Sequence, residues 1–270
     1  MKKTTTILLL ILSLIVIGIT AVLSNQDEKT DLQQEYTIKF SKWDAVVDIS
    51  SEPVLNLIFI GQFQGNSSSL KNEIIGIYFN QEDENIISSY DINKGDQVKD
   101  QNLYNLVINF NKENINPDDT LTSITMNFNN GESKTFQIGE ITFLEGDGSA
   151  ANIQPVGGYN VIYPRFEYKI ELENTSNDPL TVKDLVFNNS NLAVNNISIN
   201  ENELKGADEV QPGEKFSITA EVSEQKKKEF DFYQVTPQLM TNKGQFTLPT
   251  HFYELNTITE AKTNNILNRK

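Results

Sequence analysis

A strict alternation of apolar and polar residues in several short segments constrains the fold of this chain more than any other feature. Residues 166–173 read Phe-Glu-Tyr-Lys-Ile-Glu-Leu-Glu, and residues 36–40 and 216–222 alternate in the same way. A period of two places the apolar side chains on one face of a strand, as in antiparallel sheets with one buried face. No segment after the N-terminal leader sustains a helical period, so we predict an all-β fold.

Some strands and turns can be predicted in more detail. Residues 54–60 and 74–79 are apolar nearly throughout, which predicts central strands that are covered on both sides. A two-residue turn at residues 130–131 would place Phe128 opposite a serine. A three-residue loop, 129–131, with a left-handed Gly131, instead pairs Phe128 with Glu132 and Ile124 with Phe136. Beyond that turn, the apolar positions change from even to odd numbers at Gly139, which predicts a β-bulge.

The N-terminus indicates export across a membrane. Lys2 and Lys3 precede an apolar run of about 17 residues, 7–23, whereas about 20 residues span a bilayer. Lysines before the run and carboxylates after it place the rest of the chain outside the cytoplasm. A small residue, Ser24, follows the run and would suit a cleavage site. Residues 1–26 are therefore predicted to be a signal peptide or an uncleaved membrane anchor.

Composition narrows the choice of partners. The chain has 22 Lys and Arg against 37 Asp and Glu, a formal net charge of -15, and no cysteine. Such a charge repels nucleic acids and anionic lipid headgroups, so we expect neither as a partner. Without cysteine there are no disulfides and no lipid-modified cysteine, and packing alone must stabilise the fold.

The order of strands and turns predicts two domains. A polar, flexible stretch at residues 145–151 separates two segments that each hold roughly seven strand candidates, the number in a β-sandwich of about 100 residues. We predict one β-sandwich over residues 35–145, a second over 152–258, and a polar tail over 259–270.

Short turn motifs suggest what kind of sandwich the second domain is. They are Asn174-Thr175-Ser176 with Pro179 before Leu180, Val182 and Leu185, and Pro212-Gly213-Glu214 before Phe216. In these motifs, over about 80 residues, the chain resembles bacterial immunoglobulin-like surface domains. The resemblance implies an immunoglobulin-like fold for the second sandwich and no activity. For the whole chain we predict two tandem immunoglobulin-like antiparallel β-sandwiches after an N-terminal hydrophobic helix.

Residues that carry chemistry are sparse. His251 is the only histidine, and no nucleophile elbow accompanies it, so we expect an ordinary strand residue. Clusters of His and Cys for zinc or copper cannot exist here. We therefore predict no catalytic, cofactor-binding or metal-ligating residue.

Calcium is the one metal that the composition could hold. Asp91, Asn93 and Gly95 imitate the start of an EF-hand loop, but the glutamate at its twelfth position is missing, so we predict a turn. Acidic residues at 81–85 and 116–120 could pool carboxylates if their loops met, although we expect solvated loops. The three lysines at 226–228 would form a solvated loop or contact an anionic wall polymer.

These observations favour a non-enzymatic extracytoplasmic binding or scaffold protein, membrane-tethered or secreted, with a protein or cell-wall component as its partner. The alternative is a carbohydrate-active hydrolase that uses two carboxylates, for which Asp118 and Asp119 are the candidates.

Overall fold

Strands dominate the structure, a computed structural model that describes residues 37–50, 53–62, 70–79, 86–98, 101–146, 152–157, 167–225, 230–254 and 260–269. The all-β prediction is confirmed. The predicted leader, residues 1–26, lies outside the described residues. Among the helices that the structure describes, none has the length and apolar character needed to cross a membrane.

We call residues 37–146 the first half and residues 152–254 the second half. The strands of the first half are β1 (Thr37–Phe40), β2 (Trp43–Asp48), β3 (Val54–Gln62), β4 (Ile74–Phe79), β5 (Ile87–Val98), β6 (Gln101–Phe110), β7 (Thr120–Phe128) and β8 (Ser133–Leu144). Two short helical turns, α2 (Leu70–Glu73) and the 3-10 helix η3 (Lys112–Asn114), connect some of them.

The strands of the second half are β9 (Ile153–Pro155), β10 (Glu167–Asn174), β11 (Leu180–Phe187), β12 (Leu192–Ile199), β13 (Asn202–Glu203), β14 (Asp208–Val210), β15 (Lys215–Glu224), β16 (Phe232–Val235), β17 (Pro237–Thr241), β18 (Gly244–Thr247) and β19 (His251–Glu254). A helix, α3 (Glu260–Leu267), follows.

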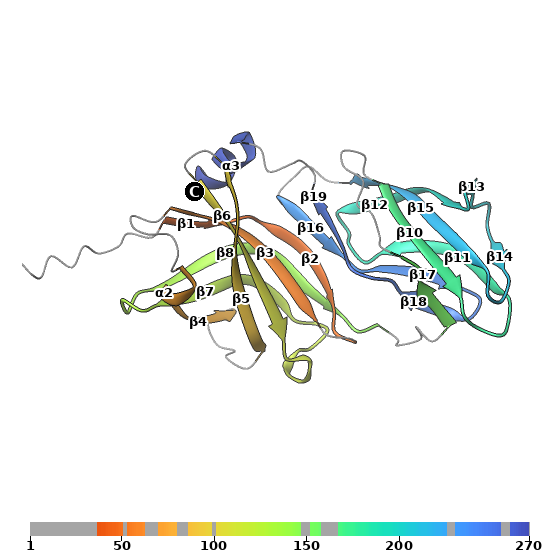
Figure 1. Cartoon of the computed structure of the whole chain (residues 1–270), viewed down its shortest axis with the longest axis horizontal. Coiled ribbons are helices and arrows are strands. Elements are labelled where there is room, and N and C mark those ends of the chain that lie inside the picture. The colour runs from red at the N-terminus through yellow and green to blue at the C-terminus, as the bar shows by residue number, and fades with distance from the viewer. Residues whose placement is uncertain are drawn as a thin grey trace, which may run out of the picture. The chain divides into compact units, whose positions relative to one another are not determined.

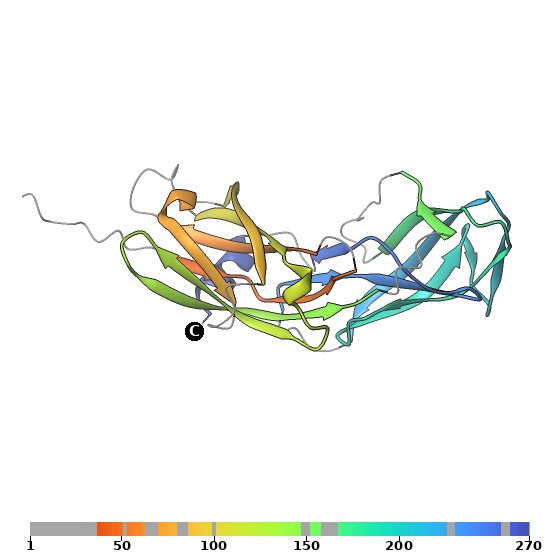
Figure 2. The same ribbon diagram turned by 90° about the horizontal axis from the view of Figure 1, so that it is seen from below.

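Two sheets build the first half, and each buries one face against the other (Figures 1 and 2). Sheet I has the order β1-β3-β6-β5, and sheet II has the order β19-β16-β2-β8-β7-β4. Phe110 of sheet I lies 5.6 Å from Phe79 and 5.3 Å from Phe143 of sheet II, measured between ring centroids. The fully buried residues between the sheets include Leu55, Leu57, Phe59, Leu106, Ile108, Ile124, Met126 and Phe128.

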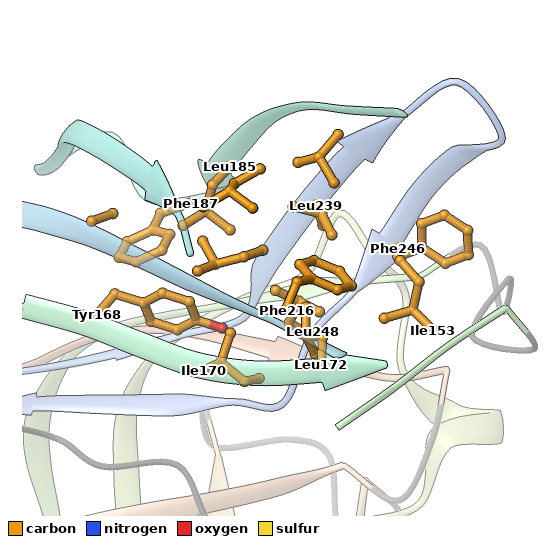
Figure 3. Close-up of a cluster of buried hydrophobic side chains, with 14 of the residues drawn as sticks. Ile153, Tyr168, Ile170, Leu172, Leu185, Phe187, Phe216, Leu239, Phe246 and Leu248 are labelled. Carbon is orange, nitrogen blue, oxygen red and sulfur yellow. The ribbon is translucent and has the colours of Figure 1, made fainter. Parts of the chain in front are cut away.

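The second half encloses a second core. Sheet III has the order β13-β12-β15-β10-β9, and sheet IV has the order β14-β11-β17-β18. Figure 3 shows the core, with Tyr168, Leu172 and Phe216 from sheet III near Leu185 and Leu239 from sheet IV. The apolar residues of β10 and β15 are buried at every second position, which confirms the alternation predicted for both strands.

Strands of the second half also extend sheet II. β16 pairs in parallel with β2, Phe232 opposite Trp43, and β19 pairs antiparallel with β16. The Trp43 and Phe232 rings stack with centroids 4.8 Å apart. The chain continues from β16 through Thr236, whose Oγ1 donates to the Val46 carbonyl at 3.1 Å, into β17 of sheet IV. One stretch of the second half therefore belongs to both cores.

A buried carboxylate lies beside this junction. Asp44 of β2 is buried, and Asn191 Nδ2 donates a hydrogen bond to its Oδ2 at 2.8 Å. Burial raises the pKa of Asp44, although the hydrogen bond from Asn191 opposes that effect.

The β7–β8 hairpin confirms the predicted turn. Ile124 pairs with Phe136, Phe128 N–H donates to the Glu132 carbonyl at 2.8 Å, and Gly131 has a φ of 84°. The predicted bulge is also present, because the β7–β8 register shifts opposite Gly139, whose φ is 102°.

Residues 54–60 lie in a central strand as predicted, whereas the prediction for residues 74–79 is wrong. β3 lies between β1 and β6, but β4 is the edge strand of sheet II, and Ile75 is 66% exposed. The register of β4 shifts between Ile74 and Gly76, which turns Ile75 outward. An apolar run does not reveal this because a bulge at an edge reverses which residues face the core.

The expectation that no helix follows the leader is also wrong, since α3 lies within the residues interpreted as a polar tail. Ile266 of α3 is buried against Ile60 and Leu103 on the outer face of sheet I. A helix of about two turns has too few apolar residues to show a period, and docking stabilises it rather than propensity.

Candidate functional site

A groove of about 740 Å³ lies between β1 and β8. β1 contributes Ile38, Lys39 and Phe40 to its lining. β8 contributes Lys134, Thr135, Phe136, Gln137, Gly139 and Glu140. Lys42, Thr122, Phe230, Ile266 and Arg269 complete it.

The groove exists because β1 and β2 join different sheets. β1 pairs with β3 of sheet I, and β2 then pairs with β8 of sheet II from Trp43, opposite Gly139, onward. The part of β8 before Gly139 therefore has β7 on one side and no strand on the other among the described residues.

Backbone groups of β8 face the groove. In an antiparallel ladder, alternate residues direct both N–H and C=O to the same neighbour. Because Phe128 N–H bonds to the Glu132 carbonyl, Lys134 and Phe136 direct their backbone groups toward β7. The backbone groups of Thr135 and Gln137 consequently point to the open edge.

The β1 edge follows the same rule. Ser41 N–H donates to the Ile58 carbonyl of β3 at 3.0 Å, so Lys39, two residues earlier, also directs its backbone groups to β3. The backbone groups of Ile38 and Phe40 then point away from β3. Two strand edges thus border the groove.

Aromatic and aliphatic side chains supply its apolar surface. The Phe40 and Phe136 rings lie 5.4 Å apart at 45°, which brings β1 of sheet I against β8 of sheet II. Phe40 and Ile266 are buried, whereas Phe136 and Phe230 remain partly exposed. An extended ligand could bury apolar side chains against the partly exposed rings of Phe136 and Phe230.

Among the described residues, four cations and one anion line the groove. The cations are Lys39, Lys42, Lys134 and Arg269, and the anion is Glu140. In a chain whose net charge is -15, this is a local reversal of sign. The groove is therefore suited to an anionic ligand.

The carboxylate of Asp231, a buried residue, fixes the position of the Arg269 guanidinium. Arg269 Nη1 and Nη2 each donate to one Asp231 carboxylate oxygen at 2.8 Å, and the Lys42 backbone N–H donates to Oδ2 at 2.7 Å. Lys39 Nζ donates to the Arg269 carbonyl at 3.2 Å. These bonds hold the end of the chain against β1.

The other two cations of the groove are Lys42 and Lys134. Lys134 Nζ lies 3.2 Å from Glu132 Oε2, and this ion pair lowers the pKa of Glu132. The Lys42 ammonium has no hydrogen-bond or ion-pair partner within the described part of the chain. Lys42 is therefore the cation whose charge is most available to a ligand.

The described lining of the groove contains few side chains of the kinds used in acid–base or nucleophilic catalysis. Within the described lining, Glu140 is the only carboxylate and there is no histidine, serine or cysteine. Hydrolysis by two carboxylates requires a second one across the groove. Elsewhere in the described residues, no group of three His, Cys, Asp or Glu side chains could hold a metal ion.

The residues weighed from the sequence lie elsewhere. His251 is in β19, opposite Val235 of β16, so its prediction as a strand residue is confirmed. The turn predicted at Asp91–Asp96 is wrong, because these residues lie within β5. A register shift between Lys94 and Gln97 sets Gly95 in an edge strand, where a bulge resembles a turn in sequence. The ion pair with Lys71 lowers the pKa of Asp91.

The acidic loop at residues 116–119 forms an ordinary turn. Asp119 Oδ2 accepts the Asn116 N–H at 3.0 Å and closes the turn before β7, and Asp118 is exposed. Residues 81–85 and the lysines at 226–228 lie outside the described residues. The expectation that the two acidic loops are solvated and do not meet therefore stays a prediction.

Sequence reasoning missed the groove residues. Lys39 and Lys134 look like ordinary polar positions of alternating strands, and Arg269 lies in the apparent tail. The alternation could have identified two edge strands, but only the fold brings residues 39, 134 and 269 together.

No family model and no curated protein matches this chain. Solved structures similar to it include a protein of unknown function from Porphyromonas gingivalis W83, with 10% identity, 82% of this chain and 99% of that chain covered, and a TM-score of 0.25. A second is the C-terminal domain of the Streptococcus agalactiae AgI/II polypeptide BspA, with 8% identity, coverage of 82% and 100%, and a TM-score of 0.20.

A third is a putative membrane anchored protein from Corynebacterium diphtheriae, with 11% identity, coverage of 83% and 59%, and a TM-score of 0.26. At TM-scores this low, the three structures identify neither the fold nor the function of this chain.

Proposed function

We propose that this chain is a non-enzymatic binding protein of the cell exterior, membrane-tethered or secreted, and that it binds a protein or cell-wall component. The observation that carries the proposal is the groove between β1 and β8. It combines open strand edges, two partly exposed aromatic rings and an excess of cations, and its described lining offers a single carboxylate.

The proposal includes two immunoglobulin-like sandwiches, over residues 35–145 and 152–258. Such domains have strands A, B, E and D in one sheet and C, F and G in the other. In the first half, β1-β3-β6-β5 follows the order A-B-E-D, and β4-β7-β8 follows C-F-G. In the second half, β9-β10-β15-β12 and β11-β17-β18 follow the same two orders.

The location rests on the leader. Lys2 and Lys3, the apolar run at 7–23 and the acidic residues after it fit export with the N-terminus inside. The partner is expected to be neither nucleic acid nor an anionic membrane surface, because the whole chain carries a charge of -15.

Location is tested by adding protease to intact cells that carry the full chain. We expect digestion without lysis, and mass spectrometry of the N-terminus then separates the anchored form from a released form that begins near Asn25. Protection in intact cells, with digestion only after lysis, would contradict an exterior location.

Binding at the groove is tested by photo-crosslinking on intact cells. A crosslinking amino acid replaces Gln137, which lines the groove, or Lys183, an exposed residue of β11 that serves as the matched control. We expect an adduct at position 137 that Lys42→Glu abolishes, and none at position 183. Equal labelling at both positions would remove the groove from the proposal.

A screen on glycans and peptides tests for enzymatic activity. Turnover that Asp118→Asn or Asp119→Asn abolishes would replace binding with hydrolysis as the function.

A further inference from the structure

The chemistry of the open β8 edge points to one class of partner. Thr135 and Gln137 each present one backbone N–H and one C=O to the groove, at the spacing of an unpaired strand edge. β2 fills that place only from Trp43 onward, so about six residues of β8, 133–138, lack a strand on this side within the described part of the chain.

We propose that the groove accepts an extended acidic peptide segment, which adds as a strand to residues 133–138 of β8 in line with β2. This inference rests on the proposed binding function and specifies its partner. Strand addition takes affinity from main-chain hydrogen bonds and specificity from alternate side chains.

A peptide fits this edge better than an anionic wall polymer does. The edge offers donors and acceptors in alternation, and an extended peptide backbone supplies matching acceptors and donors at the same spacing. Phosphate or carboxylate groups of a polymer would accept from the N–H groups of Thr135 and Gln137 and leave their carbonyls unpaired. Alternate apolar residues of a peptide could also pack against Phe136 and Phe230.

Charge selects an acidic segment. The incoming strand would run toward Lys42, whose ammonium has no partner among the described residues, and Lys39 and Lys134 flank the same path. Glu140 and the Glu132 that pairs with Lys134 are the carboxylates nearby, and Asp231 is already held by Arg269. A basic peptide would meet mostly like charges and is expected to be excluded.

The test uses the full chain in detergent or its released form, together with synthetic peptides of about eight residues. One peptide alternates glutamate with valine, a second replaces each glutamate with lysine, and a third is the acidic peptide with alternate backbone amides N-methylated. Calorimetry measures affinity, and amide hydrogen exchange follows Thr135 and Gln137.

We expect only the unmodified acidic peptide to bind, and we expect it to protect the Thr135 and Gln137 amides. Lys42→Glu should weaken its binding about tenfold or more, with a loss that shrinks at high salt, whereas Lys243→Glu, far from the groove in sequence and sheet, should not. Equal binding of the N-methylated peptide would overturn strand addition.

Other outcomes separate this inference from the proposed function. Binding of an anionic glycopolymer, but of no peptide, in a manner that depends on Lys42 would overturn the peptide inference and leave the binding function standing. Self-association that Lys42→Glu abolishes would assign the groove to a second copy of this chain and would also overturn it.

Discussion

Replacement of Gly139 by alanine tests the junction of β2 with β8. A Cβ at this position would lie 2.0 Å from the Trp43 carbonyl oxygen and 2.5 Å from its backbone nitrogen, so the backbone of β2 must move. The left-handed φ of 102° adds about 1–2 kcal/mol for any L side chain. Loss of about two ladder hydrogen bonds adds about 1 kcal/mol each. We expect Gly139→Ala to lower the free energy of unfolding by about 3–4 kcal/mol.

Gly131→Ala is the matched control, because its φ is 84° and a Cβ there meets nothing within 4 Å. It should cost only about 1–2 kcal/mol. Urea unfolding followed by tryptophan fluorescence measures both variants, and Trp43, the only tryptophan, reports from the affected strand. Equal losses for the two glycines would refute the close approach of β2 to β8.

Two further predictions concern charged groups. Arg269→Ala removes both hydrogen bonds to the Asp231 carboxylate, whose side chain is 10% exposed, and should cost about 2 kcal/mol in thermal unfolding. Lys205→Ala breaks an exposed pair with Glu203 and should change stability by less than about 1 kcal/mol, and a similar loss for both would contradict the role of Asp231 as an anchor. Burial raises the pKa of Asp44 above its ordinary value of 3.8. Ionised Asp44 therefore lowers the free energy of unfolding. This loss is absent below about pH 3.8 and develops as the pH rises through the folded pKa. Asp44→Asn, which keeps an acceptor for Asn191, should therefore stabilise the chain near neutral pH and lose this advantage in acid. Urea denaturation of both proteins across this pH range measures the difference in their free energies of unfolding. A variant that is less stable than the original chain near neutral pH would show that Asp44 is not desolvated.

Local features of this fold could be predicted because neighbouring residues determine them. The Asn129–Gly131 turn follows from matching Ile124 with Phe136, and the bulge at Gly139 follows from a change in the parity of apolar positions. In both cases a register error would expose the buried face of a strand, so the sequence permits one solution.

Features that depend on distant segments could not be predicted. β16 pairs with β2 across about 190 residues, and its all-buried pattern is equally suited to a strand inside one sandwich. The groove depends on where the chain passes from sheet I at β1 to sheet II at β2, and Arg269 reaches it only because α3 docks on Ile60 and Leu103. Neither event leaves a periodic pattern.

The openness of the β8 edge is the claim on which the binding function depends, and amide hydrogen exchange in the free protein tests it directly. We predict alternation: the Lys134 and Phe136 amides, which face β7, should be protected, whereas those of Thr135 and Gln137 should exchange rapidly. Beyond Gly139, where β2 and β7 both pair with β8, successive amides should all be protected. Protection of Thr135 and Gln137 equal to that of Phe136 would mean that the edge is already covered and would contradict the account.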